Sequence, residues 1–265
     1  ATSVTITAKS DGSTTFNNFT VATNISSSYS NAVNLVNNFT VAHDLNFTSS
    51  SIGGGSNYGI VKCPANDCVI TAQKNVTVTN NGTSSNYNTT VGDTSTNNLT
   101  IKMTGGTQAS PMTLTLSQTG AGYSYANLYA RMEFSGYTVV NRSVVGGYAN
   151  FGTNNAISTL TVNNGGTLEL GTGVISSYYS ITNNGTLNLG NSDFDNNSIF
   201  SNGATGTVTS GNSTWYQSRD FTDNGTFNLV SGTFYVDSSA TTTITAKTGG
   251  TTFNNLTFNT PSMGA

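Results

Sequence analysis

Charged residues are scarce in this chain of 265 residues: Asp, Glu, Lys and Arg make up only 7% of it, and the net charge is −3. Nucleic acids and anionic membranes require a basic protein surface, so this composition favours neither as a partner. No apolar run approaches the roughly 18 residues of a membrane-spanning helix, and the sequence therefore predicts no membrane span. Proline is also rare, with 3 residues, so few strands would be interrupted.

Residues that carry out catalysis are few as well. His43 is the single histidine and follows the strand FTVAH, so it gives no convincing Ser/His/Asp triad, and no Cys/His pair has the spacing of a metal site. Asp193 and Asp195 are two apart and would face the same side of a strand. Further acidic residues follow in the next repeats of the chain, at Asp220, Asp223 and Asp237. We interpret this strip as a solvated face rather than a sugar or Ca²⁺ site, and expect no enzymatic activity, no metal ligand and no cofactor.

The chain has 2 cysteines, Cys63 and Cys68, within the stretch KCPANDCVI. They flank a Pro-Ala-Asn-Asp turn, and neither has another cysteine to pair with. We expect a disulfide that closes a hairpin, with two reduced thiols in a loop as the alternative. A disulfide favours an extracellular location, because cytosolic thiols are kept reduced.

Uncharged polar residues dominate instead, together with 29 Gly, 13 Phe and 12 Tyr. Thr, Val, Phe and Tyr favour strands, whereas Gly and Asn favour tight turns. Disordered chains combine low hydrophobicity with high net charge, but here 35% of the residues are hydrophobic and 10% aromatic. The sequence therefore predicts an ordered, all-β protein.

A short repeat organises the second half of the chain. Its copies read TVNNGGTLELGTG from 161, ITNNGTLNLGNSDF from 181, FSNGATGTVTSGNSTW from 200 and FTDNGTFNLVSGTF from 221. Three apolar columns recur with the repeat: Val162, Ile181, Phe200 and Phe221; Leu168, Leu187, Val208 and Phe227; and Phe194, Trp215, Phe234 and Phe253. One column per strand and three strands per repeat of about 20 residues are typical of a right-handed, three-faced β-solenoid, in which stacked coils bury a shared core. The Asn-Gly pairs suit its corners.

At about 20 residues per coil the chain predicts roughly 12 to 13 coils and a rod of roughly 60 Å. The alternative is an antiparallel β-sandwich of the pilin type with donor-strand exchange, which short strands also suit. The first half keeps a looser pattern, since FNNFTVAT at 16–23 returns as VNNFTVAH at 36–43. We expect one continuous domain with irregular coils over 1–118, a Tyr-rich and less regular segment over 119–157, and regular coils over 158–265.

The two ends of the chain carry nearly the same phrase. TITA at 5–8 returns at 243–246, and TTFNN at 14–18 returns at 251–255. We interpret each copy as one solenoid coil and expect neither to be a cap, although soluble solenoids normally cover their open strand edges. Matching end coils predict an interface between subunits that involves Val4, Ile6, Phe16, Phe19, Ile244, Phe253, Leu256 and Phe258.

Two further surface features are expected. Tyr216 and Tyr235 are one repeat apart and follow inward aromatics, so they would stack outward on adjacent coils, with Tyr178 or Tyr179 extending the row. Such a row either binds a sugar or protein partner or simply stiffens the rod. Asn-x-Ser/Thr sequons supply candidate N-glycosylation sites, at Asn18, Asn24, Asn38, Asn46, Asn75, Asn81, Asn88, Asn98, Asn141, Asn184, Asn196, Asn212, Asn224 and Asn255.

The phrases TTFNNLTFN, VNNGGTLEL and TNNGTLNLG resemble the repeat units of secreted β-strand-repeat surface proteins of archaea and bacteria, including β-helical adhesins. The resemblance covers most of 158–265 and parts of 1–50. The overall composition is similar to that of thread and pilus subunits of thermoacidophilic archaea. The resemblance implies an extracellular structural role, often with glycosylation and often with a strand donated between subunits, and it carries over no individual residue.

These observations predict a secreted, cell-surface structural subunit that forms a homopolymer. Copies would join head to tail, either through matching end coils or by donation of the strand SVTITA at 3–8, into an extracellular filament. The alternative is a monomeric carbohydrate-binding adhesin or fibre shaft whose partners are surface glycans or neighbouring cells.

Overall fold

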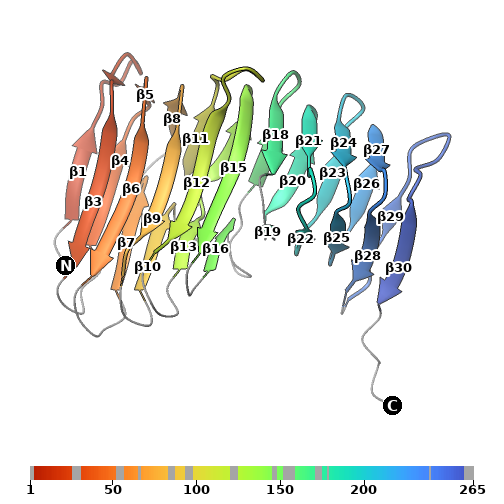
Figure 1. Cartoon of the computed structure of the whole chain (residues 1–265). Coiled ribbons are helices and arrows are strands. Elements are labelled where there is room, and N and C mark those ends of the chain that lie inside the picture. The colour runs from red at the N-terminus through yellow and green to blue at the C-terminus, as the bar shows by residue number, and fades with distance from the viewer. Residues whose placement is uncertain are drawn as a thin grey trace.

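The protein is a β-solenoid of three parallel sheets that run side by side along a rod (Figure 1). The computed structural model describes residues 3–25, 31–51, 57–64, 67–82, 87–92, 98–119, 125–144, 148–151, 159–170, 175–177, 179–238 and 240–259. Every strand pairing among them is parallel, apart from one isolated antiparallel bridge within a turn, between Thr107 and Ser110. The predicted solenoid is therefore confirmed, and the antiparallel sandwich is not favoured.

Sheet A has 11 strands: β1 (Ser3–Thr7), β4 (Asn31–Val36), β7 (Asn57–Lys62), β10 (Tyr87–Val91), β13 (Tyr125–Leu128), β16 (Tyr148–Phe151), β19 (Ile175–Ser177), β22 (Phe194–Asn196), β25 (Thr214–Gln217), β28 (Thr233–Asp237) and β30 (Asn255–Asn259). Sheet B has 10 strands: β2 (Thr15–Phe16), β5 (Phe39–Val41), β8 (Cys68–Ala72), β11 (Leu99–Met103), β14 (Arg131–Phe134), β17 (Thr159–Val162), β20 (Ser180–Asn183), β23 (Phe200–Asn202), β26 (Phe221–Asp223) and β29 (Ile244–Thr245). Sheet C has 9 strands: β3 (Phe19–Ile25), β6 (Leu45–Ser51), β9 (Val76–Asn80), β12 (Met112–Gln118), β15 (Tyr137–Val144), β18 (Thr167–Leu170), β21 (Thr186–Asn188), β24 (Thr207–Ser210) and β27 (Thr226–Leu229).

The chain visits sheets A, B and C in strict rotation from β1 to β29, so three strands make one coil. The largest sheet has 11 strands, which makes the predicted 12 to 13 coils too many and gives a rod of about 50 Å. The error lies in the first half, where some coils are much longer than in the second. Val78 pairs with Leu116 across one such long coil, whereas Leu187 pairs with the much nearer Val208.

The regular spacing of FTV in the first half also suggested, wrongly, that its copies stack in register on one sheet. FTV occurs in β3 on sheet C and in β5 on sheet B, so these two copies lie on different faces and do not stack. The Tyr-rich segment is not an insertion packed against the solenoid. Its strands β13 to β16 are members of the same three sheets as the regular coils.

The apolar core runs along the inside of all three sheets. The predicted column from Leu168 to Phe227 is confirmed in register. Two other columns need correction. Ile181 stacks on Leu160 rather than on Val162, and Phe234 stacks on Leu256 rather than on Phe253. Within single strands the alternation is as predicted, because Leu168 and Leu170 are buried while Glu169 is half-buried on the outer face.

Trp215 is fully buried at the centre of an aromatic cluster in the regular coils. Its ring centroid lies 4.8 Å from that of Phe194, 4.7 Å from Phe200 and 5.9 Å from Phe234. The first two pairs are edge-to-face and the third is stacked, and both arrangements add to the stabilisation from burial alone. With Phe227 of sheet C, whose ring centroid lies 5.5 Å from that of Trp215, these inward aromatics connect all three faces.

A buried polar ladder, which the apolar columns do not reveal, lines one corner of the same coils. Asn183 donates from Nδ2 to Oδ1 of Asn202 at 2.8 Å, and Asn202 donates from Nδ2 to Oδ1 of Asp223 at 2.8 Å. All three side chains are fully buried. The backbone N–H of Gly225 also donates to Oδ1 of Asp223, at 3.1 Å. Most buried polar groups in proteins are paired in this way; within the ladder, Asn183 Oδ1 is the buried atom without a partner.

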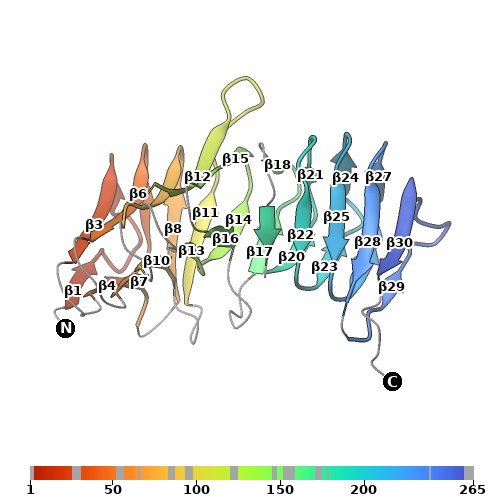
Figure 2. The same ribbon diagram turned by 60° about the horizontal axis from the view of Figure 1, so that its bottom comes forward.

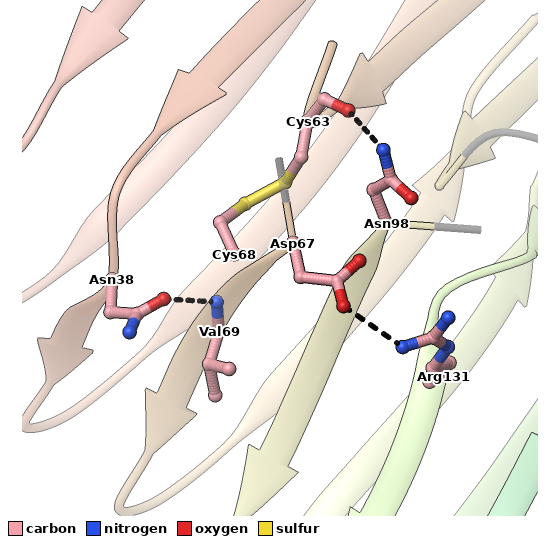
Figure 3. The surroundings of a disulfide bond; sticks show 7 residues. All are labelled: Asn38, Cys63, Asp67, Cys68, Val69, Asn98 and Arg131. Carbon is pink, nitrogen blue, oxygen red and sulfur yellow. Dashed lines mark hydrogen bonds and ion pairs between the residues drawn. A yellow bond between two sulfur atoms is a disulfide. The ribbon is translucent and has the colours of Figure 1, made fainter. Parts of the chain in front are cut away.

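The two cysteines form a disulfide between buried side chains, with Cα atoms 6.1 Å apart (Figure 3). It does not close a hairpin. Cys63 directly follows β7 of sheet A and Cys68 begins β8 of sheet B, so the bond spans a corner of the solenoid. Neighbouring coils hold this corner: Asn38 Oδ1 accepts from the N–H of Val69 at 2.8 Å, and Arg131 lies 3.5 Å from Asp67.

The ladder provides a stability test. Asn202→Ala should destabilise the fold by about 2–3 kcal/mol, because it removes the buried hydrogen bonds that Asn202 makes with Asn183 and Asp223 and leaves a cavity between them. Asn224→Ala removes an exposed side chain from the same corner and should stay within about 0.5 kcal/mol. Urea unfolding of both variants measures the difference, and equal stabilities would refute the structural role of the ladder.

Candidate functional sites at the ends of the solenoid

The first end of the rod is formed by β1, β2 and β3, each of which pairs with only one neighbour among the described strands. Their inward side chains are poorly covered. Val4 is 57% exposed, and Ile6 and Phe16 are half-buried, whereas Phe19 is buried. Phe16 and Phe19 pack together with ring centroids 5.1 Å apart. This end therefore presents free backbone groups beside an apolar cross-section.

The opposite end is formed by β27, β29 and β30, which also pair on one side only within the described part of the chain (Figures 1 and 2). Leu256 and Phe258 are 41% and 63% exposed, although their partners Phe234 and Val236 are buried. Ile244 is half-buried. The inward face of β30 thus remains open at the end of the core.

A groove of about 330 Å³ lies between β28, β29 and β30 at this end. It is lined by Val236, Ser238, Ala240, Thr242, Ile244, Phe258 and Asn259. Thr242 contributes a buried hydroxyl that has no hydrogen-bond partner. The groove is therefore mainly apolar, with one polar group still to be satisfied.

Exposed large hydrophobic side chains concentrate at these ends. Among the described residues they are Val4, Ile199, Val230, Leu256 and Phe258, and three of these five belong to the end strands β1 and β30. Single exposed hydrophobics on the sides of a protein are ordinary. Their grouping beside unpaired strand edges is typical of an association surface.

The two copies of the repeated end sequence form a similar local turn, but they lie on different sheets of the solenoid. Gly12 donates to the carbonyl of Lys9 at 3.1 Å, and Gly250 donates to that of Lys247 at 2.9 Å, with positive φ at both glycines. Yet the first TITA includes most of β1 on sheet A, and the second includes β29 on sheet B. The expectation that both copies form the same coil is wrong: the second copy is shifted by one face.

The second end is also partly covered, contrary to the expectation of two uncapped ends. The segment 246–254 crosses the end beside sheet C. Lys247 donates from Nζ to the carbonyl of Gly225 at 2.6 Å, and Thr251 donates from Oγ1 to Oδ2 of Asp223 at 2.6 Å. Phe253 packs inward, with its ring centroid 5.5 Å from that of Phe227. Sheet C is thus shielded here, while the edges of β29 and β30 are free.

Tyr216 and Tyr235 form the predicted stacked pair on the outer face of sheet A. They are in register, with ring centroids 5.2 Å apart and an interplanar angle of 16°. Asp195 precedes them in the same column. Burial raises the pKa of the Tyr216 hydroxyl, and Asp193, Tyr235 and Asp195 add to this rise. The pair is a half-exposed aromatic platform with carboxylates at its edge.

Tyr179 does not extend this platform. Its side chain is fully buried and its hydroxyl donates to the carbonyl of Leu128. Tyr178 lies outside the described residues. The expected acidic strip is not formed either, because Asp223 belongs to sheet B and is buried in the ladder, while Asp220 accepts from the N–H of Thr243 at 2.8 Å. The platform therefore consists of two rings.

His43 is exposed in the turn after β5, where its N–H donates to the carbonyl of Asn17 at 2.8 Å. The described part of the chain contains no group of three or more His, Cys, Asp or Glu residues that could hold a metal ion. No helix with the length and hydropathy to span a membrane occurs in the same residues.

The sequons lie mainly on the outside of the coils. Exposed side chains among them belong to Asn18, Asn38, Asn81, Asn141, Asn212, Asn224 and Asn255. Half-buried ones belong to Asn46, Asn75, Asn98 and Asn184. The side chains of Asn24 and Asn88 lie outside the description. Asn196 is fully buried and donates from Nδ2 to Gln217 Oε1 at 2.9 Å, so the folded chain has no room for a glycan there.

Comparison of the chain with protein-family models, with curated proteins and with solved structures finds no match. The candidate sites therefore rest on the geometry described above.

The aromatic platform predicts a specific pH dependence. Because the folded state raises the pKa of Tyr216 above its ordinary value of about 10, the stability from this group is present below that value. It is lost as the pH rises through the raised value. The hydrogen bond to Glu169 also raises the pKa of Tyr137, so the test uses a Tyr137→Phe background. In that background, ultraviolet absorbance titration should show a late component that Tyr216→Phe removes and that Asp193→Asn shifts to lower pH. A late component of unchanged size after Tyr216→Phe in the same background would contradict the assignment.

Proposed function

We propose that this protein is a secreted structural subunit that polymerises head to tail into an extracellular filament. The observation that carries the proposal is the state of the two ends. Each combines unpaired strand edges with inward apolar side chains that are left exposed, namely Val4 at one end and Leu256 and Phe258 at the other.

The two ends differ in strands and residues, so a contact between them is heterologous. Such a contact does not close on itself when the subunits are joined along a common axis, and it generates a fibre. The N-terminus and the C-terminus lie at opposite ends of the rod, as the two views show (Figures 1 and 2). Each added subunit would therefore leave a new free end in the same orientation.

Two versions of the contact follow from the fold. In end stacking, β1 keeps its five-residue pairing with β4 and its outer edge pairs with the preceding subunit. In strand donation, β1 leaves β4 and completes the sheet of the preceding subunit. End stacking needs no native pairing to be broken, so it is the version that we develop.

An extracellular location is supported by the Cys63–Cys68 disulfide, since such bonds persist in oxidising compartments. The exposed sequon asparagines are consistent with glycans that project from the sides of the rod. Neither the disulfide nor the sequon asparagines add a charged side chain to the proposed end contact.

Charge substitutions at the ends test the assembly directly. Val4→Asp or Phe258→Asp should each weaken association by about 3 kcal/mol or more, roughly 100-fold, because an unpaired carboxylate would be buried in the contact. Sedimentation velocity of the purified variants should show single subunits where the unaltered protein forms long polymers. Ile199→Asp is the matched control, since Ile199 is 48% exposed on the side of the rod, and it should polymerise normally.

A mixture of the two end variants sharpens this test. Val4→Asp keeps an intact second end and Phe258→Asp keeps an intact first end, so together they should form one-to-one dimers and nothing longer. Unimpaired polymers of either variant alone, or no dimers in the mixture, would refute the head-to-tail contact.

A second function, carbohydrate binding by a monomeric adhesin or fibre shaft, is favoured by the Tyr216–Tyr235 platform. Stacked, half-exposed rings beside Asp195 match the apolar faces and hydroxyl groups of sugars. A glycan array should then show binding that Tyr216→Ala with Tyr235→Ala abolishes. The control Tyr137→Ala changes a tyrosine on sheet C and should leave binding intact. No binding by the unaltered protein would leave the platform a structural ladder.

A further inference from the structure

The winding of the chain gives each end a stepped shape. Successive strands advance along the rod by one third of a strand spacing, because sheets A, B and C are visited in turn. At the first end the lowest step is β1, followed by β2 and β3. At the second end β29 on sheet B is followed by β30 on sheet A, so one strand of sheet C is omitted. The segment 246–254 passes beside that position and contacts Gly225, Asp223 and Phe227 through the side chains of Lys247, Thr251 and Phe253.

A second copy can be stacked in three orientations, and the steps distinguish them. If sheet A of the added copy is placed on sheet A of the first copy, the added β1 lies one strand spacing from β30 of the first copy. The added β2 is then two spacings from β29, which leaves backbone groups unpaired. If sheet A of the added copy is placed on sheet C of the first, the added β2 falls where β30 of the first copy already lies. If sheet A of the added copy is placed on sheet B of the first, the added β1 lies one spacing from β29 and the added β3 lies one spacing from β30.

We infer that successive subunits of the filament are rotated by one face, so that β1 of one copy pairs with β29 of the preceding copy and β3 pairs with its β30. This inference rests on the proposed head-to-tail assembly and specifies its interface. In this orientation β2 lies above the segment 251–254, whose side chains contact Asp223 and Phe227 beside the position of the omitted strand. Two of the three faces then continue through the junction by strand pairing, and the third continues through side-chain contacts.

The repeated end phrases support this orientation independently. Their shift by one face within a single chain is the same shift that the steps require between two chains. Ile6 is then placed over Ile244, and Phe16 over Phe253. On the other pair of strands, Phe19 is placed over Leu256 and Val21 over Phe258. Each pair places an apolar side chain on an apolar one, as Leu168 and Leu187 do inside the solenoid.

The inward direction of each residue is preserved across the proposed junction. Ile6 pairs with buried Leu35, and Ile244 pairs with buried Phe221, so both face the core of their own subunit. Val4, two residues before Ile6, is brought above Thr242 at the mouth of the groove. An exposed apolar side chain of the first end thereby enters the apolar groove of the second.

One like-charge contact arises in this register, between Lys9 and Lys247 at the shared corner. Lys247 is turned back into its own subunit, where its Nζ lies 2.6 Å from the carbonyl oxygen of Gly225. The ammonium group of Lys247 is therefore directed away from the junction, and the register remains acceptable.

The filament symmetry follows from the same counting. Each subunit advances by about ten strand spacings, roughly 50 Å, and turns by about one third of a revolution beyond any twist of the solenoid itself. Three subunits thus restore the starting face after about 150 Å.

Paired cysteines distinguish the orientations. The rotated junction places Thr5 of one copy beside Thr243 of the other, whereas the face-aligned junction places Thr5 beside Asn259. Filaments of Thr5→Cys with Thr243→Cys should form a ladder of disulfide-linked oligomers on a non-reducing gel. Filaments of Thr5→Cys with Asn259→Cys are the matched control and should remain as single chains. The native disulfide is buried within one chain and does not take part.

Sedimentation of the same samples tests head-to-tail assembly separately from the one-face rotation. Filaments that cross-link only through Asn259→Cys, or through neither pair, would overturn the one-face rotation while leaving head-to-tail assembly standing. Failure of the unaltered protein to form filaments would overturn both.

Discussion

Parallel backbone pairing between consecutive coils is the interaction on which the rest of this structure depends. No coil can bury its own apolar side, and each is held by the coils before and after it. Inside the rod every strand has neighbours on both sides, but β1, β2 and β3 at one end and β27, β29 and β30 at the other have one each among the described strands. Within the described chain, the pairing that builds the fold is therefore open at both ends, and this is the basis of the proposed assembly.

All three faces present inward apolar side chains to one shared core, and this explains both what the sequence could predict and where it misled. Alternating inward residues such as Leu168 and Leu170 predicted the solenoid and its core correctly. Equal spacing of apolar residues along the sequence predicted which residues stack only where the corners of successive coils have nearly constant length, as between Leu187 and Val208. In the first half the corners vary, so FTV at 19–21 and at 39–41 looked like stacked repeats although they lie on different sheets.

Polar residues in the core were missed for a different reason. Asn183, Asn202 and Asp223 recur at the same steps as the apolar columns, but only their mutual hydrogen bonds make an inward position acceptable. An Asn or Asp one or two residues before a corner glycine was the available signal. The interface residues at the ends remain a prediction from the sequence, whereas the one-face shift between the two TITA copies required the order of the strands in the sheets.

Electron micrographs of the purified, unaltered protein test most directly whether the unpaired strand edges at its ends drive assembly. We expect continuous threads of the width of one solenoid, which lengthen as the protein concentration rises. Separate rods of about 50 Å at every concentration would contradict this expectation.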